Sequence, residues 1–154
     1  MKRILLTTAI TVAAAAAAVT QMPNAAQAGG RGFNQIGPTV TFGNGNSVFG
    51  INSKLGIADN LSLRPFITFP AGGTVFGSGL TYDWDLGRRS PLTPFVGAGI
   101  NFATGGGATA TTGSFLAGAD WNFTREFALN GTVDIPFNSA DGGTSVTLGG
   151  AFRF

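Results

Sequence analysis

Apolar and polar residues alternate along most of this chain, and every charged residue within the alternating segments lies on the same face. The last segment shows the pattern: Leu148, Phe152 and Phe154 share one face, whereas Arg153 lies on the other. Successive side chains of a β-strand point to opposite faces, so a period of two predicts strands with two unlike faces. No segment beyond the N-terminal stretch has the period of a helix. The fold class is therefore predicted to be all-β.

The alternation divides into eight segments, each separated from the next by residues that favour turns, such as Asn60 or Gly105-Gly106-Gly107. An even number of antiparallel strands suits an up-and-down sheet in which each strand pairs with its neighbour in sequence. The predicted strands span 34–43, 47–57, 61–70, 74–86, 92–102, 111–123, 127–137 and 144–154.

The composition of the two faces indicates which one is buried. Charged residues make up 10% of the chain, whereas a water-facing surface carries about 25–35%. The polar face consists mainly of Gly, Ser, Thr and Asn, and the other face carries large apolar side chains with aromatic residues toward the strand ends. Such aromatic girdles lie at bilayer interfaces, and hydrocarbon does not tolerate open sheet edges. We therefore expect an eight-stranded antiparallel transmembrane β-barrel. A soluble β-protein with an apolar core is the alternative fold.

The N-terminal segment is predicted to be a cleavable signal peptide. Met1-Lys2-Arg3 precedes an uncharged stretch rich in Ala and Thr, and Ala26 and Ala28 fit the small-x-small cleavage rule. The apolar run is too short for a membrane-spanning helix, which needs roughly twenty strongly apolar residues. The expected domains are a signal peptide at 1–28 and a barrel at 29–154.

The charge and the missing residue types exclude several functions. Removal of Lys2 and Arg3 would leave seven of the nine basic residues, which equals the seven acidic ones. A neutral chain gives no reason to expect a nucleic-acid partner. The sequence has no Cys and no His, so a disulfide, a thiolate or imidazole metal site and an imidazole base are excluded. We expect no enzymatic activity and no cofactor. One alternative is that Asp83 and Asp85, at alternate positions of one strand, form an acid/base or metal-binding pair.

Two segments give the mature chain a resemblance to a known family. Pro94-Phe95-Val96-Gly97-Ala98-Gly99-Ile100 is similar to a strand motif common in the small eight-stranded outer-membrane barrels, the family of the OmpA transmembrane domain and OmpX. The C-terminal segment, with Phe152 and the last residue Phe154, resembles the signal that the outer-membrane assembly machinery reads. Known enzymes among outer-membrane barrels use a His, which this chain lacks.

The resemblance implies a location in the outer membrane, with the bilayer and the assembly machinery as partners and both termini in the periplasm. It also implies periplasmic turns at 58–60, 87–91 and 124–126, and outer loops at 44–46, 71–73, 103–110 and 138–143.

The polar face would line a lumen that is only wide enough for side chains or one small ligand. If Ile57 pairs with Leu61, Lys54 lies opposite Arg64, and these like charges require carboxylates such as Asp83 nearby. We therefore expect a paired internal network, with a proton or ion path as the alternative. The predicted lumen charges are Lys54, Arg64, Asp83, Asp85, Asp120, Asp134 and Arg153.

The functional expectation is a monomeric outer-membrane barrel with a structural role in the envelope and a lumen filled by side chains. One alternative is a narrow porin-like channel for small solutes or ions. A second is an adhesin-like protein that binds through its outer loops, although these loops are short and contain one charge, Asp141.

Overall fold

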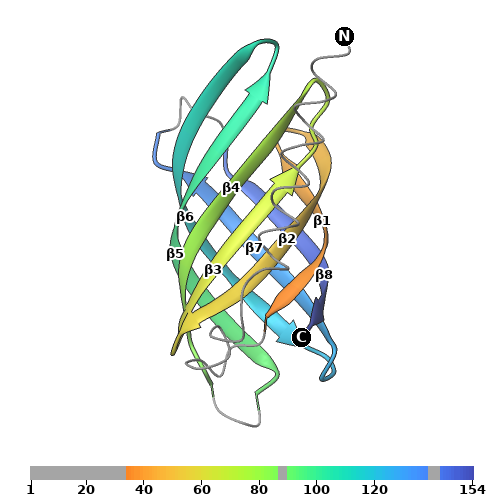
Figure 1. Cartoon of the computed structure of the whole chain (residues 1–154), viewed down its shortest axis with the longest axis vertical. Coiled ribbons are helices and arrows are strands. Elements are labelled where there is room, and N and C mark those ends of the chain that lie inside the picture. Colours follow the sequence, from red (N-terminus) through yellow and green to blue (C-terminus); the bar gives the residue numbers. More distant parts are fainter. Residues whose placement is uncertain (1–33, 87–89, 139–142) are drawn as a thin grey trace.

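The computed structural model describes residues 34–86, 90–138 and 143–154. They form one closed barrel of eight antiparallel strands, in which each strand pairs with the next and β8 pairs with β1 (Figure 1). The predicted all-β, eight-stranded antiparallel barrel is thereby confirmed. The predicted signal peptide and its cleavage site at Ala26 and Ala28 lie outside the described residues. The strands are β1 (Gln35–Gly43), β2 (Asn46–Ala58), β3 (Leu61–Thr68), β4 (Gly73–Asp83), β5 (Leu92–Gly105), β6 (Ala108–Asn122), β7 (Phe127–Pro136) and β8 (Ser145–Arg153).

The first and last strands define the two ends of the barrel. We call the end where β1 begins and β8 ends the terminal end, and the opposite end the hairpin end (Figure 1). The hairpin end carries tight turns at Asn44-Gly45 and Gly106-Gly107. Asn44 and Gly45 have φ values of 50° and 77°, which is the conformation that an Asn-Gly turn adopts between two antiparallel strands. No helix within these described ranges is long and apolar enough to cross a membrane.

The hairpin of β5 and β6 is longer than predicted. Gly105 pairs with Ala108, so the connection is reduced to Gly106 and Gly107, whose φ values are 57° and 84°. Glycine adopts positive φ without a steric penalty, so these two residues close a turn that others would strain. The prediction of an outer loop at 103–110 is therefore wrong. Its residues instead extend the two strands, and the hairpin projects beyond its neighbours (Figure 1).

The turn between β2 and β3 also differs from the prediction. Leu61 pairs with Ala58 and not with Ile57, so the turn contains two residues instead of three, and Asn60 closes it with a positive φ of 62°. The register then shifts between Gly56 and Ala58, as expected for a bulge that absorbs one extra residue. Because Leu55 pairs with Leu63 beyond this shift, Lys54 still lies opposite Arg64, as predicted.

Large apolar side chains cover the outside of the barrel. Phe49 is 72% exposed and Leu148 is 53% exposed, whereas the inward-facing Thr81 and Ser114 are fully buried. A soluble β-protein with an apolar core would show the opposite arrangement, so that alternative does not fit. Aromatic residues pair on the surface near both ends: Tyr82 with Trp84, Trp121 with Phe123 and Phe127 with Phe152 toward the terminal end, and Phe76 with Phe102 and Phe115 with Phe137 toward the hairpin end.

Candidate functional site

Four charged side chains meet inside the barrel toward its terminal end. They come from β2, β3, β4 and β6, and none of their side chains is more than 11% exposed. We call this group the charge cluster; it consists of Lys54, Arg64, Asp83 and Asp120. Two cations face two anions, so the cluster is formally neutral.

Lys54 joins the two carboxylates of the cluster. Its Nζ lies 2.6 Å from Asp83 Oδ2 and 2.9 Å from Asp120 Oδ2. Asp120 belongs to β6, four strands away from β2, so this contact crosses the lumen. Closure of the barrel is what brings the two groups together.

Arg64 binds Asp120 with two parallel hydrogen bonds. Nη1 donates to Oδ1 at 3.0 Å and Nη2 to Oδ2 at 2.7 Å, the bidentate geometry that favours arginine over lysine. Nη2 also contacts Asp83 Oδ1 at 3.3 Å. The remaining nitrogen, Nε, donates to Thr81 Oγ1 at 3.0 Å.

Neutral side chains complete the cluster. Ser62 donates to Asp83 Oδ2 at 2.6 Å, and Thr81 donates to Asp83 Oδ1 at 3.1 Å. The Cζ of Arg64 lies 3.5 Å from the centre of the Phe95 ring, within the range of a cation–π interaction. Each charge therefore has partners on more than one side, which is the condition for burying charged groups without a large penalty.

The other predicted lumen charges lie elsewhere. Asp85, expected beside Asp83, follows the end of β4 and is exposed. It therefore does not share the buried environment of Asp83, and the structure does not assemble the two-carboxylate pair that was the alternative interpretation of these residues. Arg153 lies at the terminal end, where its Nη1 donates to the carbonyl oxygen of Thr124 at 2.8 Å. Asp134 faces the lumen in the hairpin half.

Sequence reasoning missed Phe95, which is 1% exposed and lies under Arg64. Its position on β5 carries the signal, because Phe95 shares a face with Gly97 and Gly99, the small residues of the polar side. Gly118 on β6 is the residue paired with Phe95 on β5, and its lack of a side chain leaves room for the ring. A Cβ at Gly118 would lie 2.6 Å from Phe95 Cζ and would also clash with the carbonyl oxygen of Gly131.

Further side chains fill the middle of the lumen. Asn52 and Asn130 exchange hydrogen bonds across it, with Nδ2 to Oδ1 distances of 3.1 and 3.4 Å. Leu116 is 7% exposed, and a Cβ at Gly79 would collide with its Cδ1. The lumen is thus occupied from the charge cluster to its middle.

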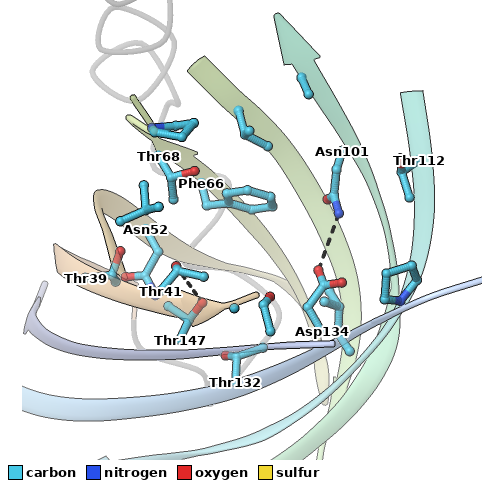
Figure 2. Close-up of a pocket in the computed structure, with 18 of the residues that line it drawn as sticks. Thr39, Thr41, Asn52, Phe66, Thr68, Asn101, Thr112, Thr132, Asp134 and Thr147 are labelled. Carbon is cyan, nitrogen blue, oxygen red and sulfur yellow. Dashed lines mark hydrogen bonds between the residues drawn. The ribbon is translucent and has the colours of Figure 1, made fainter. Parts of the chain in front are cut away.

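Toward the hairpin end the lumen opens into a cavity of about 370 Å³, which Asn52 and Leu116 also line. It reaches from Arg64 and Ser53 to Asn44 and Gly143 near the hairpin end. Figure 2 shows that threonine side chains from several strands point into this space around Asp134. We call it the Asp134 cavity; the residues labelled there are Thr39, Thr41, Asn52, Phe66, Thr68, Asn101, Thr112, Thr132, Asp134 and Thr147.

A closed eight-stranded barrel with an apolar outside and a charged, polar lumen has the fold of the small outer-membrane β-barrels. The N-terminal β-barrel domain of OprF from Pseudomonas aeruginosa is similar, with a TM-score of 0.61 and 18% identity over 79% of this chain and 97% of that one. OprG, an outer-membrane protein of the same organism, has a TM-score of 0.55 and 11% identity over 82% and 98%. A de novo designed transmembrane β-barrel has a TM-score of 0.66 and 18% identity over 80% and 96%.

These likenesses confirm at the level of fold the resemblance that the sequence suggested. No protein-family model matches the chain, and no curated protein matches it.

Proposed function

We propose that this protein is an integral outer-membrane barrel with a structural role in the envelope and a lumen that conducts neither solutes nor ions. The observation that carries the proposal is that the apolar face of the sheet lies outside and the polar face inside, the reverse of a soluble protein. Phe49, Phe115 and Leu148 cover the outside, whereas the charge cluster is sealed inside. A surface of this kind is stable in contact with acyl chains and aggregates in water.

The charge cluster supports the closed lumen. A conducting path would have to pass Arg64, whose guanidinium is held by Asp83, Asp120 and Thr81 on one side and lies over Phe95 on the other. Asn52, Asn130 and Leu116 narrow the lumen on the hairpin side of Arg64.

We further propose that both termini lie in the periplasm, that the chain is exported by its N-terminal segment and cleaved after Ala28, and that the barrel is monomeric. This orientation is the one that the resemblance to the small outer-membrane barrels implies. Phe152 and Phe154 are 57% and 59% exposed at the end of the last strand, so both rings are accessible to the assembly machinery.

The described loops present few side chains that a surface partner or a substrate could contact. The projecting β5–β6 hairpin ends in Ala, Thr and Gly, whereas recognition surfaces are rich in aromatic residues and arginine. Two of the buried carboxylates, Asp83 and Asp120, are held by cations and hydroxyls. We therefore propose neither an adhesin nor an enzyme.

Conductance in planar bilayers tests the closed lumen. We expect no current from the wild type, and none from Arg64→Ala or Asp83→Ala, because Phe95, Leu116 and the Asn52–Asn130 pair remain. Steady current from the folded wild type would contradict the proposal and favour the narrow channel. Gel mobility before and after boiling, with fractionation of the cell envelope, tests the membrane assignment independently.

A further inference from the structure

The Asp134 cavity contains a carboxylate without a cation. Asp134 Oδ2 accepts hydrogen bonds from Ser114 Oγ at 3.0 Å and from Asn101 Nδ2 at 3.4 Å (Figure 2). Within the described ranges these neutral groups are its polar partners, and no Lys or Arg forms a salt bridge with it. Asp83 and Asp120, by contrast, each contact both Lys54 and Arg64. The two halves of the lumen are therefore built differently.

The charge balance of the cavity favours a cation. Arg64 reaches its lower wall, but that guanidinium belongs to the neutral charge cluster and is held there by both carboxylates. The charge that remains in the hairpin half of the described lumen is the negative charge of Asp134. Asp134 is half-buried, so its carboxylate is only partly solvated; a cation bound there would be stabilised and an anion repelled.

The size and walls of the cavity indicate an organic cation. A volume of about 370 Å³ falls within the roughly 300–1,000 Å³ of small-molecule pockets and far exceeds the roughly 30 Å³ share of one water. Calcium takes about six to eight oxygen ligands at close range, whereas this cavity offers one carboxylate. Phe66, Val75 and Leu116 add apolar walls that would contact an alkyl group.

We propose that the Asp134 cavity binds a small protonated amine, with the ammonium group at Asp134 and a short alkyl chain against Phe66, Val75 and Leu116. The cavity extends toward the hairpin end, where Asn44 and Gly143 line it. The charge cluster closes it below, so the amine binds but does not pass through.

The test is a titration of the full chain, folded in zwitterionic detergent, followed by the amide NMR shifts of Asn101, Ser114 and Asp134. The probes are n-butylammonium, n-butanol and butyrate, which share a chain length but differ in charge. Because a hydrogen bond to a charged group is worth a factor of about 10 or more, butylammonium should bind at least about tenfold more tightly than butanol, and butyrate should not bind.

Two variants localise the site. Asp134→Asn should weaken butylammonium binding by about tenfold, whereas Asp59→Asn, which removes a carboxylate from an exposed turn at the terminal end, should leave it unchanged. Thr132→Leu keeps the charge and fills the cavity, so it should abolish binding. Gel mobility before and after boiling shows that each variant is folded.

Equal binding of butylammonium and butanol to the wild type would overturn the proposal without any variant. Undiminished amine binding by folded Thr132→Leu or Asp134→Asn would also overturn it. If CaCl₂ shifts the same amides at lower concentration than the amine, the site is a metal site and the amine proposal is wrong. Conductance does not enter this titration, so failure here is distinguishable from failure of the closed-lumen proposal.

Discussion

Inside the barrel, the guanidinium of Arg64 lies over the ring of Phe95, with Cζ 3.5 Å from the ring centre. The two residues come from β3 and β5, which are separated by β4. Their contact therefore joins two strands that are not hydrogen-bonded neighbours, on the lumen side of β4. It joins the charge cluster to the largest fully buried apolar side chain of the described barrel.

Phe95→Ala should destabilise the barrel strongly. The substitution removes the ring under Arg64 and leaves a cavity beside Gly118, and truncation of a buried Phe costs about 3–5 kcal/mol. Denaturant unfolding in detergent, followed by gel mobility, measures the loss. Phe49→Ala is the matched control. Because Phe49 is 72% exposed on the outside, this variant should lose clearly less free energy of unfolding. Equal losses would contradict the assignment of Phe95 as a structural anchor of the lumen.

The charge cluster should behave as one unit in a double-mutant cycle. Asp120→Asn leaves Lys54 and Arg64 under-compensated in a buried site, and removal of one partner from such a network costs about 3–5 kcal/mol. Lys54→Met should also destabilise the fold. The double variant should lose less than the sum of the two single losses, by about 0.5–3 kcal/mol. Strict additivity of the unfolding free energies would show that Lys54 and Asp120 do not interact.

Leu148→Arg tests which face meets lipid. Leu148 lies on the outside of β8, paired with Val40 and Gly131 away from either end of the strand. A charge placed near the middle of the bilayer on this face should cost about 2–4 kcal/mol. Leu148→Ala serves as the control for side-chain loss alone. Folding in lipid vesicles with wild-type stability would contradict the outward orientation.

Deletion of Phe154 should impair assembly and spare stability. The ring is 59% exposed and follows the last residue of β8, so the folded barrel gains little from it. We expect a lower yield in the outer membrane and an unchanged unfolding midpoint for the purified protein. A wild-type yield would remove the role assigned to the C-terminal segment.

The fold could be predicted from the sequence because apolar and polar residues alternate along every strand of a membrane barrel. The alternation around Leu148 and Arg153 fixes orientation residue by residue, and all eight strands begin and end within three residues of the predicted positions. The end of β5 and the start of β6 each extend three residues beyond the prediction, because Gly106 and Gly107 close the hairpin in two residues. Runs of glycine signal a turn but not its length.

The charge cluster could be predicted only in part. Register between adjacent strands brings Lys54 opposite Arg64, and this follows from the sequence. The contact of Lys54 with Asp120 crosses the barrel between strands that do not pair, so no local register predicts it. Asp85 was misplaced because β4 ends at Asp83, beyond which alternation no longer determines the direction of a side chain.

The matched pair Leu148 and Leu116 gives the most direct test of the central claim. Leu148 is 53% exposed on the outside and Leu116 is 7% exposed in the lumen. In nanodiscs containing a lipid with a spin label near the end of its acyl chain, the methyl NMR signals of Leu148 should broaden and those of Leu116 should stay sharp. Equal broadening of both, or broadening of Leu116 alone, would contradict a barrel with its apolar face in lipid and its lumen sealed.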